Sequence, residues 1–238
     1  FFLGAVLMRS AGCIVNDIFD RNFDKKVKRT KNRPIASGKI TIKLALIYTI
    51  VLCFLALLVL INFNWITIIL ALSSMPLAFT YPLMKRYTYW PQLFLGVTFN
   101  YGLILGWVCI NDGIDLAPLI FYIGAIFWTL GYDTIYGFQD IKDDEIIGVK
   151  STSIKFKKKP KLFLTTCYLI FIISLILVGI YMKLNTMFNF FILISTTHLF
   201  FYQIHNFNFK DPKNCLRIFK SNNFFGAIVL CNILIGKL

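Results

Sequence analysis

The chain has 238 residues, of which 58% are hydrophobic and only 15% are charged, and its mean hydropathy is +0.70. Soluble domains carry about a quarter charged residues, so this composition excludes an ordinary soluble protein and is typical of a polytopic helical membrane protein. The net charge is +14 at pH 7, and the six scattered cysteines and two histidines form neither a disulfide framework nor a zinc site.

Apolar runs mark the predicted membrane-spanning helices in chain order. The first run, at 1–15, is shorter than the roughly 20 residues that a span requires, so we expect at least half a helix to be missing from an N-terminally truncated chain. Later runs approach the spanning length, at 42–62, 65–84, 92–110, 116–138, 161–182, 187–204 and 222–237. The sequence therefore predicts one all-α transmembrane domain over residues 1–238.

The segments between these runs divide into two kinds. Short turns are predicted at 62–64, 111–113 and 183–185. The other segments are basic and hold 9, 2, 7 and 4 of the 25 Lys and Arg residues, at 21–43, 85–86, 142–161 and 205–220. Basic loops stay on the cytoplasmic or matrix side. We therefore predict an integral membrane protein with these loops on that side, in a bacterial inner membrane or, alternatively, a mitochondrial inner membrane.

The first acidic cluster ends the first apolar run. Its side chains recur at helical spacing and so share one helix face, with Arg9 deeper on the same stripe; they are Asn16, Asp17, Asp20 and Asp24. Clustered carboxylates repel one another and call for a cation, and oxygen ligands suit Mg²⁺. The alternative is a helix end solvated at the membrane surface, with Asp–Lys pairs around it.

The second acidic cluster follows the run at 116–138. Asp140 and Asp144 are four residues apart, and Asp133 and Tyr136 extend the same helical stripe toward the membrane interior. A charge at the depth of Asp133 is costly and therefore indicates function; the alternative is a carboxylate hydrogen-bonded to a buried tyrosine or to the backbone. Both clusters are expected on the basic side, which predicts one shared metal–diphosphate site.

Basic residues near the clusters are candidates to bind the diphosphate. Lys85 and Arg86 follow the run at 65–84, Arg29 follows the first cluster and Lys150 follows the second. Other cations of these loops, Lys28 among them, are as readily explained by topology and by contacts with anionic lipid headgroups.

Five blocks carry a resemblance to a known family, in this order: Met8–Asp20, Val27–Pro34, Tyr81–Arg86, Tyr132–Tyr136 and Gly148–Thr152. Together they resemble the UbiA superfamily of intramembrane prenyltransferases, and within it the branch that prenylates 4-hydroxybenzoate in ubiquinone biosynthesis. The resemblance implies nine helices around a cavity open to lipid, with the first helix and its contacts to the aromatic acid preceding Phe1. It also implies Mg²⁺ bound by Asn16, Asp17, Asp20 and Asp24 and by Asp140 and Asp144.

The implied reaction transfers a polyprenyl group from its diphosphate to the ring carbon ortho to the hydroxyl of 4-hydroxybenzoate. Catalytic roles are expected for Arg9, Asp20, Asp133 and Asp140. Substrate contacts are expected for Arg29, Lys85, Arg86, Tyr132, Tyr136 and Lys150. The expected partners are the polyprenyl diphosphate, the aromatic acid and the lipid bilayer, with no nucleic acid.

Three alternatives stay open. The same fold can prenylate another acceptor, such as a naphthoate, homogentisate or haem. A CDP-alcohol phosphotransferase would also use aspartates to bind metal, but its compact Asp/Gly/Arg motif is not found in the sequence. A non-enzymatic transporter would carry charges near the middle of the bilayer on several helices.

Overall fold

The computed structural model describes residues 1–27 and 29–237, and within these ranges it contains helices and loops but no strand. The predicted all-α fold is confirmed. Eight segments are long and apolar enough to cross a membrane: Phe2–Asp24, Ile42–Leu60, Trp65–Tyr87, Pro91–Asn111, Leu116–Gly137, Pro160–Tyr181, Thr186–Ile204 and Pro212–Lys237.

Five of these spans are single helices: α1 (Phe2–Asp24), α2 (Ile42–Leu60), α7 (Leu116–Gly137), α10 (Pro160–Tyr181) and α12 (Pro212–Lys237). The other three change character along their length. They are α3 (Trp65–Thr80) followed by η1 (Tyr81–Leu83) and α4 (Met84–Tyr87), α5 (Pro91–Phe99) followed by α6 (Gly102–Asn111), and α11 (Thr186–Thr197) followed by the π-helix η2 (His198–Ile204). Two short helices, α8 (Ile141–Ile147) and α9 (Thr152–Lys155), lie between α7 and α10.

The predicted turns at 62–64, 111–113 and 183–185 are confirmed, and their residues explain where the helices stop. Asn64 and Asn185 cap the next helix by accepting a hydrogen bond from the backbone N–H of Thr67 and Phe188. Asp112 and Lys183 adopt left-handed backbone angles with φ of 53° at the ends of α6 and α10. This conformation ends a helix and reverses the chain.

The helices form two groups that pack differently. Helices α7, α10, α11 and α12 share the continuous buried core, which includes Leu130, Tyr168, Phe188 and Phe225. The four earlier spans bury far fewer residues inside the protein, from 6% to 17% of each apolar window against 33% to 50% in the later four. The first group therefore packs less densely than the second, and α5 joins it to α7 of the second group.

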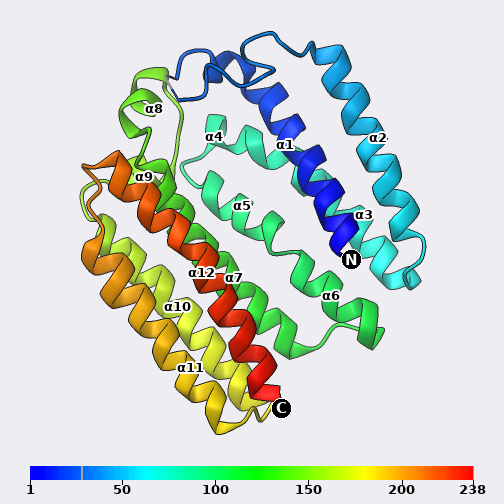
Figure 1. The fold of residues 1–238 in the computed structure, drawn as a ribbon, viewed down its shortest axis with the longest axis vertical. Helices are drawn as coiled ribbons and strands as arrows, with labels where there is room; N and C mark the ends of the chain where they lie inside the picture. Colours follow the sequence, from blue (N-terminus) through cyan, green and yellow to red (C-terminus); the bar gives the residue numbers. More distant parts are fainter. Residues whose placement is uncertain (28, 238) are drawn as a thin grey trace.

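All the basic segments lie at one end of the bundle. Figure 1 shows the loop after α1 beside α8, with α4 and the start of α12 at the same end, whereas the turns joining α2 to α3 and α10 to α11 lie at the other. The charge asymmetry of the sequence thus matches the alternating direction of the helices. Lys28, one of the cations of the first loop, lies outside the described residues.

The predicted helix through the first acidic cluster is confirmed, because α1 continues to Asp24. Two predicted boundaries are wrong. The basic segment 142–161 is not simply a loop, because it contains most of α8 and all of α9. The last helix begins at Pro212 rather than 222, because Cys215, Ile218 and Asn222 form a buried stripe on a stretch that also carries several charged and polar residues.

Candidate active site

The first acidic cluster lies on the last two turns of α1, and two of its carboxylates are buried. Asp20 and Asp24 are only 4% and 7% exposed. Arg33 returns from the following loop, and its Nη1 lies 2.8 Å from Asp17 Oδ1 and 3.1 Å from Asp24 Oδ2. The basic loop therefore folds back to neutralise part of the cluster that precedes it.

Lys85 supplies a second cation to this cluster from a different span. Its ammonium forms an ion pair with Asp20 Oδ2. The other oxygen of this carboxylate, Oδ1, is buried and has no hydrogen-bond partner among the described residues. A buried carboxylate oxygen without a donor is costly, so this atom is suited to a cation that approaches from the cavity.

The second cluster is held by Arg29 rather than by one continuous helix. Helix α7 ends at Gly137 and Asp140 occupies the cap position before α8, so the predicted stripe from Asp133 through Tyr136 to Asp140 is broken. Arg29 joins the two parts instead. Its Nε and Nη2 donate to Asp140 Oδ2 at 2.8 and 2.6 Å, and its Nη1 donates to the Tyr136 hydroxyl at 2.8 Å.

Both clusters line one cavity of about 220 Å³. Its acidic and amide side chains come from α1, α5, α7 and the region of α8, and they are Asn16, Asp20, Asp24, Gln92, Asp133, Asp140 and Asp144. Its cations are Arg29, Arg33, Lys85 and Lys150. Two segments more than 100 residues apart thus meet with four cations around them, which is suited to a polyanionic ligand.

Asp144 adds a carboxylate that no described cation pairs with directly. Burial raises the pKa of its carboxyl to about 6, and the nearby Asp140 adds to the rise while Lys85 and Arg29 oppose it. A cation bound nearby would stabilise the ionised form of this carboxyl group. Among the described residues no three acidic, histidine or cysteine side chains converge as a ready-made metal site, but oxygen ligands of the kind that Mg²⁺ prefers line the cavity.

Four predicted site residues lie off this cavity. Asp17 forms an ion pair with Arg33 but does not itself line the cavity. Arg86 turns toward α1, where its Nη2 donates to the Phe19 carbonyl at 2.7 Å.

The other two are Tyr132 and Arg9. Tyr132 packs against Trp128 and Phe219, with ring centroids 5.5 and 5.8 Å away. Arg9 lies over the Phe99 ring and lines a second pocket instead.

The residues after Lys150, which the sequence only partly indicated, fix that wall of the cavity in place. The Thr152 N–H donates to Gln92 Oε1 at 3.0 Å, and the Ser153 hydroxyl donates to the Thr134 carbonyl at 2.8 Å. A Cβ on Gly137 would stand 2.4 Å from Ser153 Oγ, so only glycine lets α9 approach α7 this closely. Nothing in the sequence singles out Gln92, because one glutamine within an apolar run has many structural uses.

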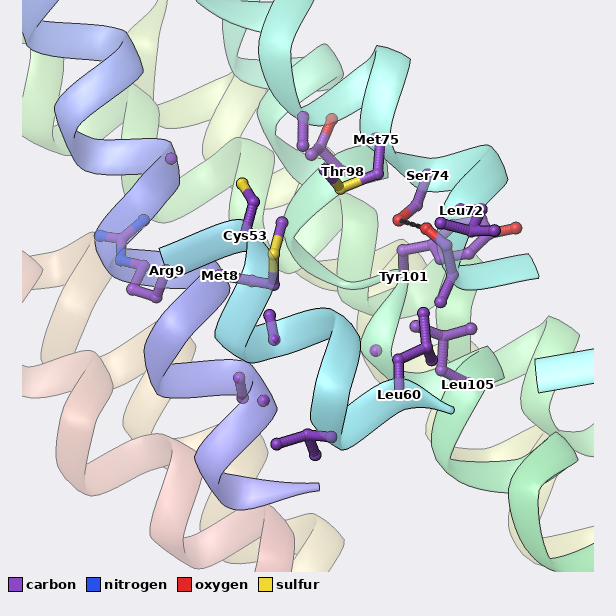
Figure 2. Close-up of a pocket in the computed structure, with 18 of the residues that line it drawn as sticks. Met8, Arg9, Cys53, Leu60, Leu72, Ser74, Met75, Thr98, Tyr101 and Leu105 are labelled. Atoms are coloured by element: carbon purple, nitrogen blue, oxygen red, sulfur yellow. Dashed lines mark hydrogen bonds between the residues drawn. The ribbon is translucent and has the colours of Figure 1, made fainter. Parts of the chain in front are cut away.

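An apolar pocket of about 570 Å³ adjoins the acidic cavity. The two share Tyr81 and Leu95 in their walls. Figure 2 shows the labelled side chains of this pocket, including Met8, Cys53, Met75 and Leu105, arranged between α1, α2, α3 and α6. A charged compartment therefore opens beside a larger hydrocarbon-like one.

Comparisons with known proteins place this geometry in a family. The UbiA prenyltransferase family matches residues 1–229. A 4-hydroxybenzoate geranyltransferase of Lithospermum erythrorhizon is 42% identical over 237 residues, which cover 98% of this chain and 76% of that protein. The mitochondrial 4-hydroxybenzoate polyprenyltransferase of Bos taurus is 42% identical over 239 residues, which cover 100% of this chain and 64% of that protein.

Solved structures agree on the fold. A UbiA homologue from Aeropyrum pernix superposes with a TM-score of 0.73 at 19% identity, covering 98% of this chain and 90% of that one. A UbiA homologue from Archaeoglobus fulgidus, bound to GPP and Mg²⁺, gives a TM-score of 0.71 at 18% identity, covering 99% and 87%. Both likenesses concern the arrangement of the helices. With the family match over almost its whole length, this chain belongs to the UbiA prenyltransferase family.

Proposed function

We propose that this protein transfers a polyprenyl group from polyprenyl diphosphate to the ring carbon ortho to the hydroxyl of 4-hydroxybenzoate. The observation that carries the proposal is the cavity formed by two acidic clusters and four cations, adjoining an apolar pocket with which it shares wall residues. The relatives near 40% identity, which are named for prenyl transfer to 4-hydroxybenzoate, support the acceptor. They favour it over naphthoate, homogentisate or haem, and favour an enzyme over a transporter.

The cations of the cavity bind the diphosphate. Arg29, Lys85 and Lys150 are presented by three separate segments, so they can contact several phosphate oxygens at once. The chemistry that Mg²⁺ supplies when bound is neutralisation of the diphosphate charge as that group leaves. The residues that would hold it are Asn16, Asp20, Asp24, Asp140 and Asp144, and Mg²⁺ in the Archaeoglobus fulgidus homologue supports this cofactor. Asp17 instead orients Arg33.

The hydrocarbon chain of the donor occupies the apolar pocket, which excludes water from the reacting carbon. Breakage of the allylic C–O bond leaves its electron pair on the diphosphate. The electron-rich ring carbon of the acceptor then forms the new C–C bond, and its proton passes to a base. Asp133 on α7 lines the acidic cavity and is our candidate for the base, with the released diphosphate as the competing acceptor. The products are the prenylated acid and diphosphate.

The basic loops indicate on which side of the membrane the cavity lies. We place the cavity on the matrix side of the mitochondrial inner membrane, because several relatives are named as mitochondrial and basic loops stay on that side.

The test is product analysis in membranes that contain the protein. Membranes receive 4-hydroxybenzoate, Mg²⁺ and polyprenyl diphosphates of several lengths, and mass spectrometry identifies the prenylated acid and its substitution position. Parallel reactions with a naphthoate and homogentisate compare the acceptors. Absence of any prenylated product, with the protein present in the membrane, would contradict the enzymatic proposal; product with another acceptor only would contradict the choice of 4-hydroxybenzoate.

A further inference from the structure

A second basic groove lies away from the acidic cavity, where the start of α10 meets the segment joining η2 to α12. Its walls include Lys158, Lys159, Lys161, Leu162, Phe207 and Phe209, around a volume of about 440 Å³. None of these residues lines the acidic cavity or the apolar pocket.

The rim of this groove carries cations that the protein does not neutralise. Lys157 is paired with Glu145, and Lys155 lies 4.3 Å from the Trp90 ring centroid. Lys158 and Lys159, by contrast, are exposed and form no ion pair or side-chain hydrogen bond among the described residues. Their positive charge is therefore available to a ligand.

Lys161 closes the groove by connecting its two walls. Its Nζ donates to the His205 carbonyl at 3.1 Å, which ties the first turn of α10 to the end of η2. Within the described part of the chain, the groove walls carry these three lysines and no acidic residue, so the groove is positively charged.

The floor of the groove is apolar and continues onto the lipid-facing side of α10. Phe207 and Phe209 pack against the buried Phe138, with ring centroids 5.5 and 5.7 Å away. Leu162 is 61% exposed at the first turn of α10, and Leu169 and Ile173 extend its exposed face along the helix. Cations at the end of a spanning helix thus stand above an exposed hydrocarbon stripe.

We propose that this groove binds an anionic phospholipid, with its headgroup phosphate among Lys158, Lys159 and Lys161 and an acyl chain along Leu162, Leu169 and Ile173. Basic residues at the membrane surface attract anionic headgroups. The apolar floor favours a lipid over a free anion, because only a lipid covers the exposed leucine and isoleucine side chains of α10. This inference does not depend on the proposed reaction.

The test compares two lipids that differ only in headgroup charge. Native mass spectrometry of the purified full chain, in neutral detergent, measures the apparent Kd for the first bound dioleoyl phosphatidylglycerol or dioleoyl phosphatidylcholine. The groove variant is Lys158→Gln/Lys159→Gln/Lys161→Gln. The control variant, Lys31→Gln/Lys39→Gln/Lys43→Gln, removes the same charge from exposed positions in the first basic loop.

We expect phosphatidylglycerol to bind more tightly than phosphatidylcholine, and the groove variant to weaken its binding by about tenfold while the control changes it less than about twofold. The single variants Lys158→Gln and Lys159→Gln give the same result with smaller losses. Equal losses in the two triple variants would overturn the proposal, as would equal binding of both lipids by the wild-type protein. Displacement of the lipid by inorganic phosphate would assign the groove to a free anion instead.

Discussion

Arg29 and Asp140 are 111 residues apart in the sequence, yet two nitrogens of the guanidinium donate to one oxygen of the carboxylate, at 2.8 and 2.6 Å. The third donor of the fork reaches the Tyr136 hydroxyl. One side chain from the first basic loop thus holds the end of α7 and the start of α8 together at the cavity. It ties the loop that follows the first acidic cluster directly to the second cluster.

The first prediction follows from this fork. Arg29→Lys keeps the charge but replaces several fixed donors by one ammonium, which cannot reach Tyr136 and Asp140 in the same way. We expect kcat/KM for the prenyl diphosphate to fall about 10- to 100-fold. Steady-state kinetics of the purified enzyme measure this, with Lys26→Gln as the control because Lys26 is exposed in the same loop. Wild-type kinetics in Arg29→Lys would show that the fork is not needed.

The second prediction concerns the carboxylates that face the cavity. Asp20→Ala and Asp144→Ala each remove a carboxylate that we propose as a Mg²⁺ ligand, so we expect turnover to fall by at least about 100-fold. Product formation in membranes is normalised to the amount of protein detected there. Asp115→Asn is the matched control, since Asp115 caps α7 at the opposite end of that helix and asparagine is also a good cap. Near-normal prenylation by either alanine variant, with Mg²⁺ supplied, would refute the assignment of that carboxylate.

The third prediction separates two adjacent cations that look alike in the sequence. Lys85 lines the cavity and pairs with Asp20, so Lys85→Gln should lower kcat/KM for the prenyl diphosphate about tenfold or more. Arg86 bonds to the Phe19 carbonyl and lies 5.3 Å from the Phe23 ring centroid. Arg86→Gln should therefore lower the free energy of unfolding by about 1–2 kcal/mol, seen as a lower Tm in detergent. A larger kinetic defect in Arg86→Gln than in Lys85→Gln would reverse these roles.

The acidic clusters could be predicted because their signals are local. Asn16, Asp20 and Asp24 recur every four residues on what is one continuous helix, and the alternation of apolar runs with basic loops fixes which ends lie together. The eight spans follow from length and hydropathy for the same reason.

The rest depends on contacts that spacing does not encode. Tyr136 and Asp140 have helical spacing, but α7 stops at Gly137, where close packing against Ser153 requires a residue without a Cβ. The early start of α12 escapes a search for apolar runs, because charged and polar residues interrupt the buried stripe of Cys215, Ile218 and Asn222. The start of α12 can be recognised from the helical spacing of its apolar residues but not from their mean hydropathy.

The last prediction tests the dense packing of the second helix group. Gly131 on α7 lies against Tyr168 of α10, and a Cβ at this position would stand 2.5 Å from the ring carbon Cε1. The ring cannot move aside easily, because it is fully buried and its hydroxyl donates to Gln203 Oε1 at 2.6 Å. Overpacking of this kind costs about 1–3 kcal/mol, so Gly131→Ala should lower the Tm in detergent.

Gly106 on α6 provides the matched comparison, since a Cβ there meets no atom within 4 Å. Gly106→Ala should leave the Tm unchanged or raise it, because alanine is favoured over glycine in a helix by about 1 kcal/mol. If both variants lowered the Tm equally, the loss would reflect a general intolerance of alanine in the spans. A loss confined to Gly131→Ala would instead localise the rigid part of the protein to the α7–α10 contact, which is the framework that carries Asp133 and Tyr136 into the cavity.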